Sequence, residues 1–565
     1  MSTLVHFAVQ NKDTVIEGIL QEILVAERRH RSVFDAPQWV LGYFISLLGG
    51  CATYQPPASI RDHVISLDSD ALAHDPCDYG KKLGMEKDGP FDQYLDRMMA
   101  AMDQWDESRH DAVRKILIFV HGGLTAVESA DQDAVNETGP AEDGRSYPIY
   151  IDWDSGFTSS YGEHVTAVSQ GIKAYNQLWA RSLLSPFYVV ADIGRAVTRI
   201  PEVWSEEVIT DSQTASTDLA SVQKRNDGHP LHWLDYAPED ISVQTFKRLD
   251  ALYADEVLHH PGLNAVDLCN DPERRQIMLS IGTTDTTKGE LLGLGAMYAA
   301  TIPPKFGLSW VVDGLGGPSW DNMIRRTLLI VDGSPRNDAT ARRFRKRASF
   351  ENPDNPLAQE PVGPALLLID KLADHLQRIS QEYKDRGQAP PKYEVTLVGH
   401  SMGSMVINEL LFRKCHESDV EFKNVVFLAA ACSVRDCARC VVPYLRAHPA
   451  TRFYNLCLHP TADLQERDAG DLPPRGSLLV WIDEFLADPP TMYDRTMGRW
   501  TNVLEGIGQF PQDIRGQMTI KAFNLRQTDD FFLGQPQKHS QFRGQKYWSE
   551  SFWQADPPDS SVAPR

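Results

Sequence analysis

The chain has 565 residues, of which 42% are hydrophobic and 24% are charged, so it can bury a large core. Its formal net charge of -21 excludes a general positive field, and we therefore expect no nucleic-acid partner. The sequence has no phosphate-binding loop, no dinucleotide-binding glycine motif after a strand and no His-Glu-x-x-His motif. Beyond Cys437-x-x-Cys440 there is no second close ligand pair for zinc, so no metal and no cofactor is expected.

Residues 1–51 contain an apolar run from Trp39 to Cys51 that is too short to cross a membrane but fits the apolar region of a signal peptide. The run ends in Leu-Gly-Gly-Cys, which resembles the lipoprotein processing box of bacteria. That resemblance implies a lipidated Cys51 that anchors the protein in a bacterial cell envelope. The alternative is the N-terminal helix of a cytoplasmic protein in which Cys51 is a free thiol.

After a leading region, residues 52–111, the segment 112–160 has the features of the first half of an α/β core. The apolar run Ile116 to Val120 predicts a strand that leads directly into His121-Gly122-Gly123. Glycines let a backbone approach a substrate oxygen closely, so Gly122 and Gly123 are predicted to supply an oxyanion N–H. His121 is expected to brace this loop. A second strand is predicted from Tyr147 to Ser155.

Residues 161–355 form an insertion far longer than an ordinary connecting loop, so they are expected to fold as a subdomain. The segment Tyr175 to Trp204 has the pattern of amphipathic helices broken at Pro186 and Pro201. We expect a helical cap. A rigid cap is favoured over a lid that opens at a lipid surface.

The second half of the core, residues 356–554, contains the most informative motif of the chain. An apolar strand pattern from Tyr393 to Val398 runs into Gly-His-Ser-Met-Gly at 399–403, and a helical pattern follows. Glycines on both sides of Ser401 permit a strained turn that exposes its hydroxyl at a helix N-terminus. The pattern predicts that Ser401 is a nucleophile and that the N–H of Met402 is the second oxyanion donor.

Three further strands are predicted at Asn424–Ala430, Arg452–Leu458 and Met518–Phe523, with the rhythm of a parallel sheet. In such sheets ligands bind beyond the carboxyl ends of the strands. The acid chosen on this basis is Asp463, with Glu466 and Asp468 as alternatives. His539 is the only histidine after the last predicted strand and is expected to be the general base. The tail, 555–565, is expected to be disordered.

Together these segments resemble the α/β-hydrolase superfamily, and within it the bacterial lipase- and esterase-like proteins with a strand-Trp-Asp/Pro-Ser segment, here Trp153-Asp154-Ser155. The likeness covers residues 112–160 and 390–545. It implies an α/β-hydrolase fold, with a mostly parallel central sheet flanked by helices and a large helical cap. It also implies hydrolysis of a carboxylic ester, small-molecule or lipid, through an acyl intermediate on Ser401, with Asp463 and His539.

Two alternatives keep the same fold. An acyltransferase would use the same three residues with an alcohol in place of water as the acceptor. A catalytically inactive binding protein would retain only the architecture. The sequence indicates neither the acyl group nor the oligomeric state.

Overall fold

The structure is a computed structural model that describes residues 56–166, 168–173, 187–199, 312–333, 362–415, 420–466, 476–523 and 536–553, with short gaps inside these ranges. The chain divides between Tyr54 and Gln55, and every described residue belongs to the part after that division. Cys51, Asp468 and the tail 555–565 lie outside the described residues.

A nine-stranded sheet forms the centre of the described part, in the order β11-β10-β9-β8-β4-β5-β1-β2-β3. The seven strands from β11 to β1 in this order run parallel to one another, and the β1–β2 and β2–β3 pairs are antiparallel. The predicted α/β class with a mostly parallel sheet is therefore confirmed. The strands are β1 (Val64–Leu67), β2 (Ala73–Asp75), β3 (Asp78–Lys82), β4 (Val113–Val120), β5 (Ser146–Trp153), β8 (Lys392–His400), β9 (Phe422–Leu428), β10 (Arg452–Cys457) and β11 (Met518–Ala522), with β6 (Val168–Ser169) and β7 (Ile172–Lys173) in a separate hairpin.

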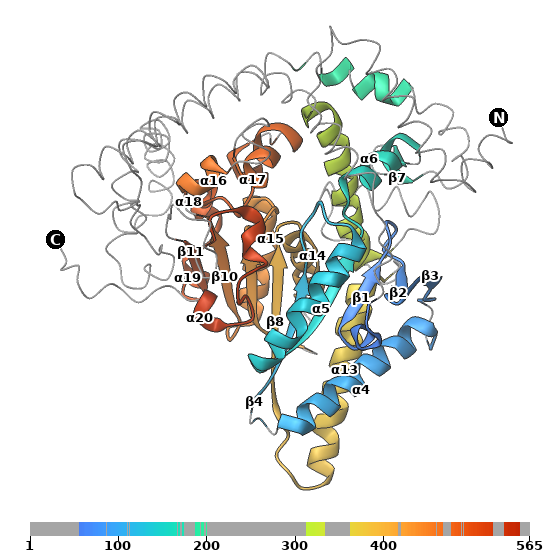
Figure 1. Cartoon of the computed structure of the whole chain (residues 1–565). Coiled ribbons are helices and arrows are strands. Elements are labelled where there is room, and N and C mark those ends of the chain that lie inside the picture. Colours follow the sequence, from blue (N-terminus) through green and yellow to red (C-terminus); the bar gives the residue numbers. More distant parts are fainter. Residues whose placement is uncertain are drawn as a thin grey trace, which may run out of the picture. The chain divides into compact units, whose positions relative to one another are not determined.

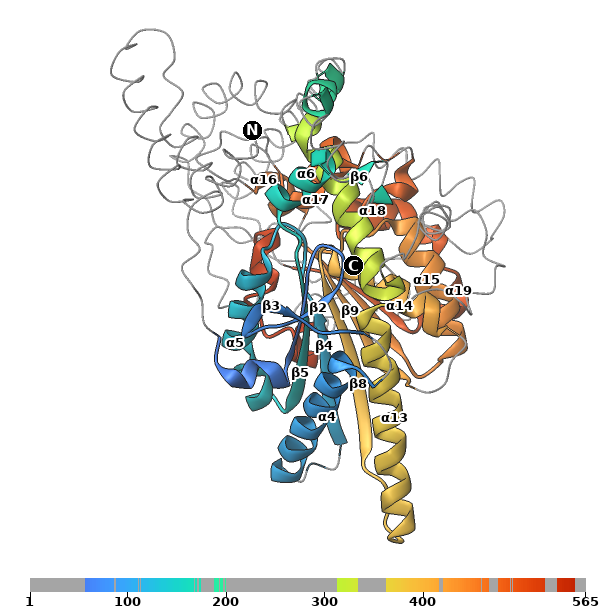
Figure 2. The same ribbon diagram turned by 90° about the vertical axis from the view of Figure 1, so that its right-hand side faces the viewer.

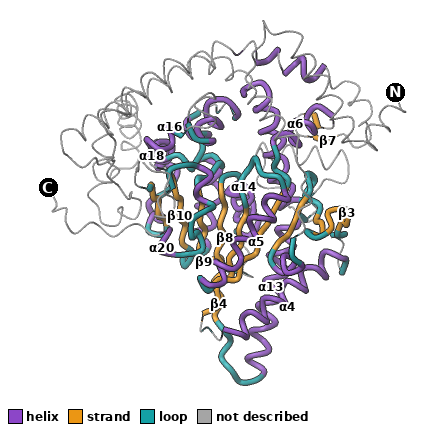
Figure 3. Tube along the Cα trace, viewed as in Figure 1, coloured by secondary structure: helices purple, strands orange, loops and turns teal. Residues whose placement is uncertain are grey.

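Helices lie on both faces of this sheet (Figures 2 and 3). Figure 2 shows α5 on one side of the strands and α13, α14 and α15 on the other. The helical elements are α4 (Pro90–Arg109), α5 (Val127–Asp143), α6 (Phe157–Thr166), α13 (Pro364–Asp385), α14 (Gly403–Lys414), α15 (Val434–Ala447), α16 (Pro460–Gln465), α17 (Leu478–Trp481), α18 (Trp500–Gly506), α19 (Gln512–Arg515) and α20 (Glu550–Trp553), together with the 3₁₀ helices η1 (Ala58–Asp62), η4 (Met492–Asp494), η5 (Ile507–Gln509) and η7 (His539–Phe542) and the π-helix η3 (Ile482–Leu486).

Each of the six predicted strands is present. The prediction succeeds because a short apolar run can be buried as a strand of the central sheet. The last five residues of β4 are buried, and so is every residue of β5. Strands β1 to β3 were not predicted. They have three to five residues each, and β3 is mostly exposed, so they leave no apolar or alternating pattern of useful length.

The strand order reverses at β4, which pairs with β5 on one side and with β8 on the other. The chain leaves β4 and β8 toward helices on opposite faces of the sheet, α5 and α14, and open α/β sheets bind ligands at the carboxyl ends of such strands. α6 and α16, which follow β5 and β10, lie at that end of the sheet (Figure 1). The topology places Gly122 and Ser401 just after these strand ends.

Most of the predicted cap, 161–355, lies outside the described residues. Within it, residues 312–332 form one helix, which includes the predicted apolar run from Trp320 to Val331. This helix is held to the core by buried arginines. Arg326 donates to the carbonyl oxygen of Asp154 at 2.7 Å, and Arg325 and Arg326 each lie 2.9 Å from Glu163 of α6. None of the described helices is both long and apolar enough to span a membrane.

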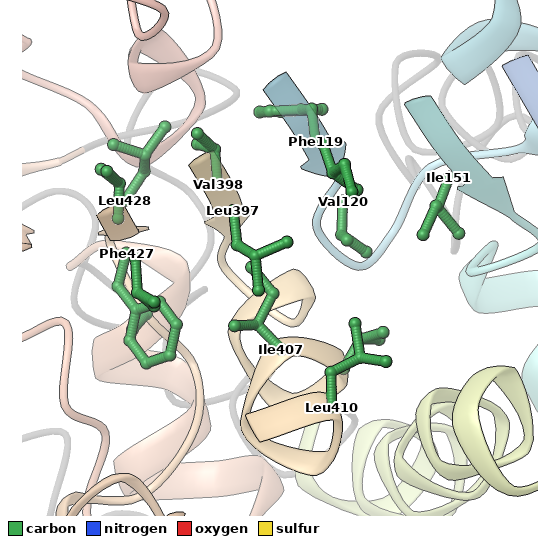
Figure 4. Packing of buried hydrophobic residues seen from close by; sticks show 14 of the residues in the cluster. Phe119, Val120, Ile151, Leu397, Val398, Ile407, Leu410, Phe427 and Leu428 are labelled. Carbon is green, nitrogen blue, oxygen red and sulfur yellow. The ribbon is translucent and has the colours of Figure 1, made fainter. Parts of the chain in front are cut away.

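Two substitutions in the core between α14 and the sheet should lower the stability of the protein by clearly different amounts. Figure 4 shows Ile407 and Leu410 of α14 among buried residues of β4, β5, β8 and β9. Leu410 is fully buried, so Leu410→Ala should lower the free energy of unfolding by about 2–5 kcal/mol through the cavity it leaves, and Ile407→Val by about 0.5–1.5 kcal/mol. Urea denaturation measures both. Equal, small losses would show that α14 is loosely packed.

Candidate functional site

The turn between β8 and α14 holds Ser401 in a strained backbone conformation. Ser401 has a φ of 51°, a left-handed value that non-glycine residues rarely adopt. Its N–H donates to the carbonyl oxygen of Leu428 at 2.9 Å, and its carbonyl oxygen accepts from the N–H of Ala431 at 3.0 Å. Strain of this kind costs about 1–3 kcal/mol and persists only where surrounding contacts impose it. The end of β9 supplies those contacts here.

Two glycines make the turn sterically feasible. A Cβ on Gly403 would collide with the carbonyl oxygen of Val120 at the end of β4, and a Cβ on Gly399 would lie 2.8 Å from the backbone of Gly403. The first turn of α14 therefore packs directly against the backbone of β4. This contact brings the start of the helix beside the loop that follows β4.

That loop, His121-Gly122-Gly123, lies against the serine turn as predicted from the motif. A Cβ on Gly122 would lie 2.8 Å from the Cβ of Ser401, and one on Gly123 would lie 2.6 Å from the Sδ of Met402. Among the described residues, the backbone N–H groups of Gly123 and Met402 donate to no other group. Two unengaged donors beside a buried hydroxyl are the arrangement that stabilises an oxyanion.

His121 braces the loop through both of its ring nitrogens. Nδ1 donates to the carbonyl oxygen of Gly122 at 2.7 Å, and Nε2 accepts from the backbone N–H of Trp153 at 2.9 Å. Burial lowers the pKa of His121 to about 3, so the ring is neutral. The hydroxyl of Ser155 lies 3.1 Å from the same Gly122 oxygen and fixes the loop from β5.

The C-terminal segment that carries His539 is fastened to α5. Arg543 lies 3.1 Å from a carboxylate oxygen of Glu137, and the hydroxyl of Tyr547 donates to the other oxygen at 2.6 Å. The rings of Tyr547 and Phe119 stack with centroids 4.5 Å apart, and the Arg543 guanidinium lies over Phe119. These contacts place η7 over the end of β4.

The structure brings His539 and the serine turn into one buried site. The Nε2 of His400, the residue before Ser401, donates to the carbonyl oxygen of His539 at 3.2 Å, and the two rings lie 5.1 Å apart. Ser401 is 1% exposed and His539 is 6% exposed. Among the described residues, neither the Ser401 hydroxyl nor either ring nitrogen of His539 has a hydrogen-bond partner, so the two are not bonded to each other.

Both histidines at the turn are neutral because they are buried. Burial lowers the pKa of His539 well below its usual range, and the nearby His400 lowers it further. Burial also lowers the pKa of His400 to about 4. A neutral imidazole can accept a proton, which is what a general base requires.

Asp463 lies at the predicted place, in α16 after β10, but its carboxylate contacts other partners. One oxygen accepts from the hydroxyl of Ser477, and the other lies 2.9 Å from Nε of Arg499. No hydrogen bond joins Asp463 to His539 among the described residues. The catalytic role of Asp463 stays a prediction.

Three contributors to the site were not predicted from the sequence. His400 was visible inside the motif, but its bond to His539 depends on residues 139 positions apart. Met323, on the helix 312–332, has its Sδ 3.7 Å from a Cβ placed on Gly123. Glu137 was not recognised as the partner of Arg543, because no local pattern relates positions 406 apart.

No protein-family model, curated protein or solved structure matches this chain. Among the described residues, no group of three or more His, Cys, Asp or Glu side chains is placed to hold a metal ion. The site must therefore be interpreted from its own geometry.

The packing of the turn against β4 predicts the effect of one methyl group. Gly403→Ala should destabilise the protein by about 1–3 kcal/mol or more, because the new Cβ meets rigid backbone. Gly162→Ala in α6 is the matched control, since nothing lies within 4 Å of its Cβ, and it should be neutral or stabilising by about 0.5–1 kcal/mol. Thermal denaturation measures both, and an undisturbed Gly403→Ala variant would contradict the close contact.

Proposed function

We propose that this protein is a serine-dependent hydrolase of the α/β-hydrolase type that cleaves a carboxylic ester through an acyl intermediate on Ser401. One observation carries the proposal: the strained Ser401 lies against the Gly122-Gly123 loop at the carboxyl ends of β4 and β8, where the strand order reverses. Strained residues cluster at active sites, and unengaged N–H donors beside a hydroxyl can stabilise the oxyanion that forms in acyl transfer.

The residues divide the reaction as follows. The Oγ of Ser401 attacks the ester carbonyl carbon, and His539 accepts the hydroxyl proton. The N–H groups of Gly123 and Met402 stabilise the oxyanion, and the imidazolium of His539 then protonates the departing alcohol. A water molecule then attacks the acyl carbonyl carbon while His539 accepts its proton. His539 returns this proton to the Oγ of Ser401 as the carboxylic acid leaves. Ser401 and His539 are not hydrogen-bonded in the structure, so the proposed reaction requires this bond to form in the complex with substrate.

The side chains around the oxyanion donors favour an apolar acyl group. The thioethers of Met402 and Met323 both lie beside Gly123, and both methionines are buried. Thioether side chains adapt their shape and carry no charge to pair with an ionic substrate. Because Ser401 is covered, an ester must displace covering residues to reach it.

Substitution of the nucleophile tests this function. Ser401→Ala should abolish labelling by a fluorophosphonate probe and lower kcat on p-nitrophenyl esters by about 10⁴-fold or more. Ser551→Ala, at an exposed position in α20, is the serine control and should label like the wild type. Persistent labelling of Ser401→Ala would overturn the proposal. A wild-type chain that neither labels nor turns over any ester would indicate a binding protein instead.

A further inference from the structure

A second carboxylate near the site is in direct contact with His539. The backbone N–H of His539 donates to Oε2 of Glu466 at 2.9 Å. Glu466 follows α16 immediately, and its own backbone is fixed on both sides: its N–H donates to Ala462 and its carbonyl oxygen accepts from Gly476, each at 3.1 Å. The carboxylate is thus held at the residue that carries the imidazole.

Asp463, in contrast, belongs to a separate buried ion network. Arg499 bridges it to Asp483, whose carboxylate lies 3.0 Å from the guanidinium. Asp483 also accepts from the backbone N–H of Thr496 and from Asn502. If Asp463 turned toward His539, the buried Arg499 would lose one of its two carboxylate partners. Removing one partner from a buried charge network is strongly unfavourable.

We propose that Glu466 is the carboxylate that orients His539, and that Asp463 has a structural role instead. The inference rests on the proposed hydrolase function. Rotation of the Glu466 side chain transfers its carboxylate from the N–H of His539 to Nδ1–H of the same residue. The Ser401 proton then moves to Nε2, the Nδ1 proton stays on the ring, and Glu466 remains ionised while it stabilises the imidazolium. Glu466 is a positioning residue, because it acts through His539.

The surroundings of His539 leave this task to Glu466. Two contacts of His539 in the described part of the chain involve titratable side chains: the His400 ring at the end of β8, 5.1 Å from the His539 ring, and the Glu466 carboxylate after α16, which accepts from the His539 backbone N–H. His400 is neutral because burial lowers its pKa to about 4, and its Nε2 is bonded to the His539 carbonyl oxygen. A neutral ring carries no negative charge with which to stabilise an imidazolium.

The experiment compares Glu466→Gln, Asp463→Asn and a surface control, Glu550→Gln, in the full chain. Glu466→Gln should lower kcat on a p-nitrophenyl ester by about 10²–10⁴-fold with little change in KM or Tm. Loss of the negative charge should also move the acid limb of the pH profile of kcat/KM to lower pH. Glu466→Asp, which keeps the charge, should leave that limb in place. Asp463→Asn should lower Tm without moving the acid limb.

A Glu466→Gln variant with wild-type kcat and pH profile overturns the inference, whether or not Asp463→Asn folds. So does an Asp463→Asn variant that loses kcat and shifts the acid limb at unchanged Tm. Either result leaves the hydrolase function in place as long as Ser401→Ala loses its probe labelling. Persistent labelling of Ser401→Ala would instead remove the function on which the inference rests.

Discussion

The close contact between the end of β4 and the first turn of α14 is the constraint on which the site depends. It exists because Gly403 has no Cβ to meet the carbonyl oxygen of Val120. The same approach presses Gly122 against Ser401, so the strained turn and the neighbouring glycine loop are produced together. A side chain at either glycine would separate the proposed nucleophile, Ser401, from the proposed oxyanion donors.

The β4–α5–β5 unit positions both halves of the proposed machinery. β4 carries the glycine loop, and α5 carries Glu137, to which the C-terminal segment with His539 is fastened through Arg543 and Tyr547. Burial raises the pKa of Glu137, and the Arg543 charge opposes that rise. A buried pair of this kind is costly to break, by about 3–5 kcal/mol when one partner is removed. His539, the proposed base, therefore has a fixed location although it lies far from Ser401 in the chain.

The sequence could predict those features of the structure that depend on residues close together in the chain. Six strands and the serine turn could be predicted, because apolar runs and flanking glycines act within a few residues. The partner of Asp463 could not, because Arg499 lies 36 positions away and nothing in the spacing distinguishes a catalytic from an ion-paired carboxylate. Strands β1 to β3 were missed for a related reason: their pairing with β5 and with each other comes from tertiary contacts.

Three buried histidines surround the turn, and their hydrogen bonds distinguish their roles. Burial lowers the pKa of His121, His400 and His539 alike, so charge does not separate them. Occupancy does. Both nitrogens of His121 are engaged, and Nε2 of His400 donates to His539, whereas neither ring nitrogen of His539 has a partner among the described residues. An unsatisfied buried polar group is costly, and acceptance of the Ser401 proton in the proposed reaction would explain why these ring nitrogens have no partner.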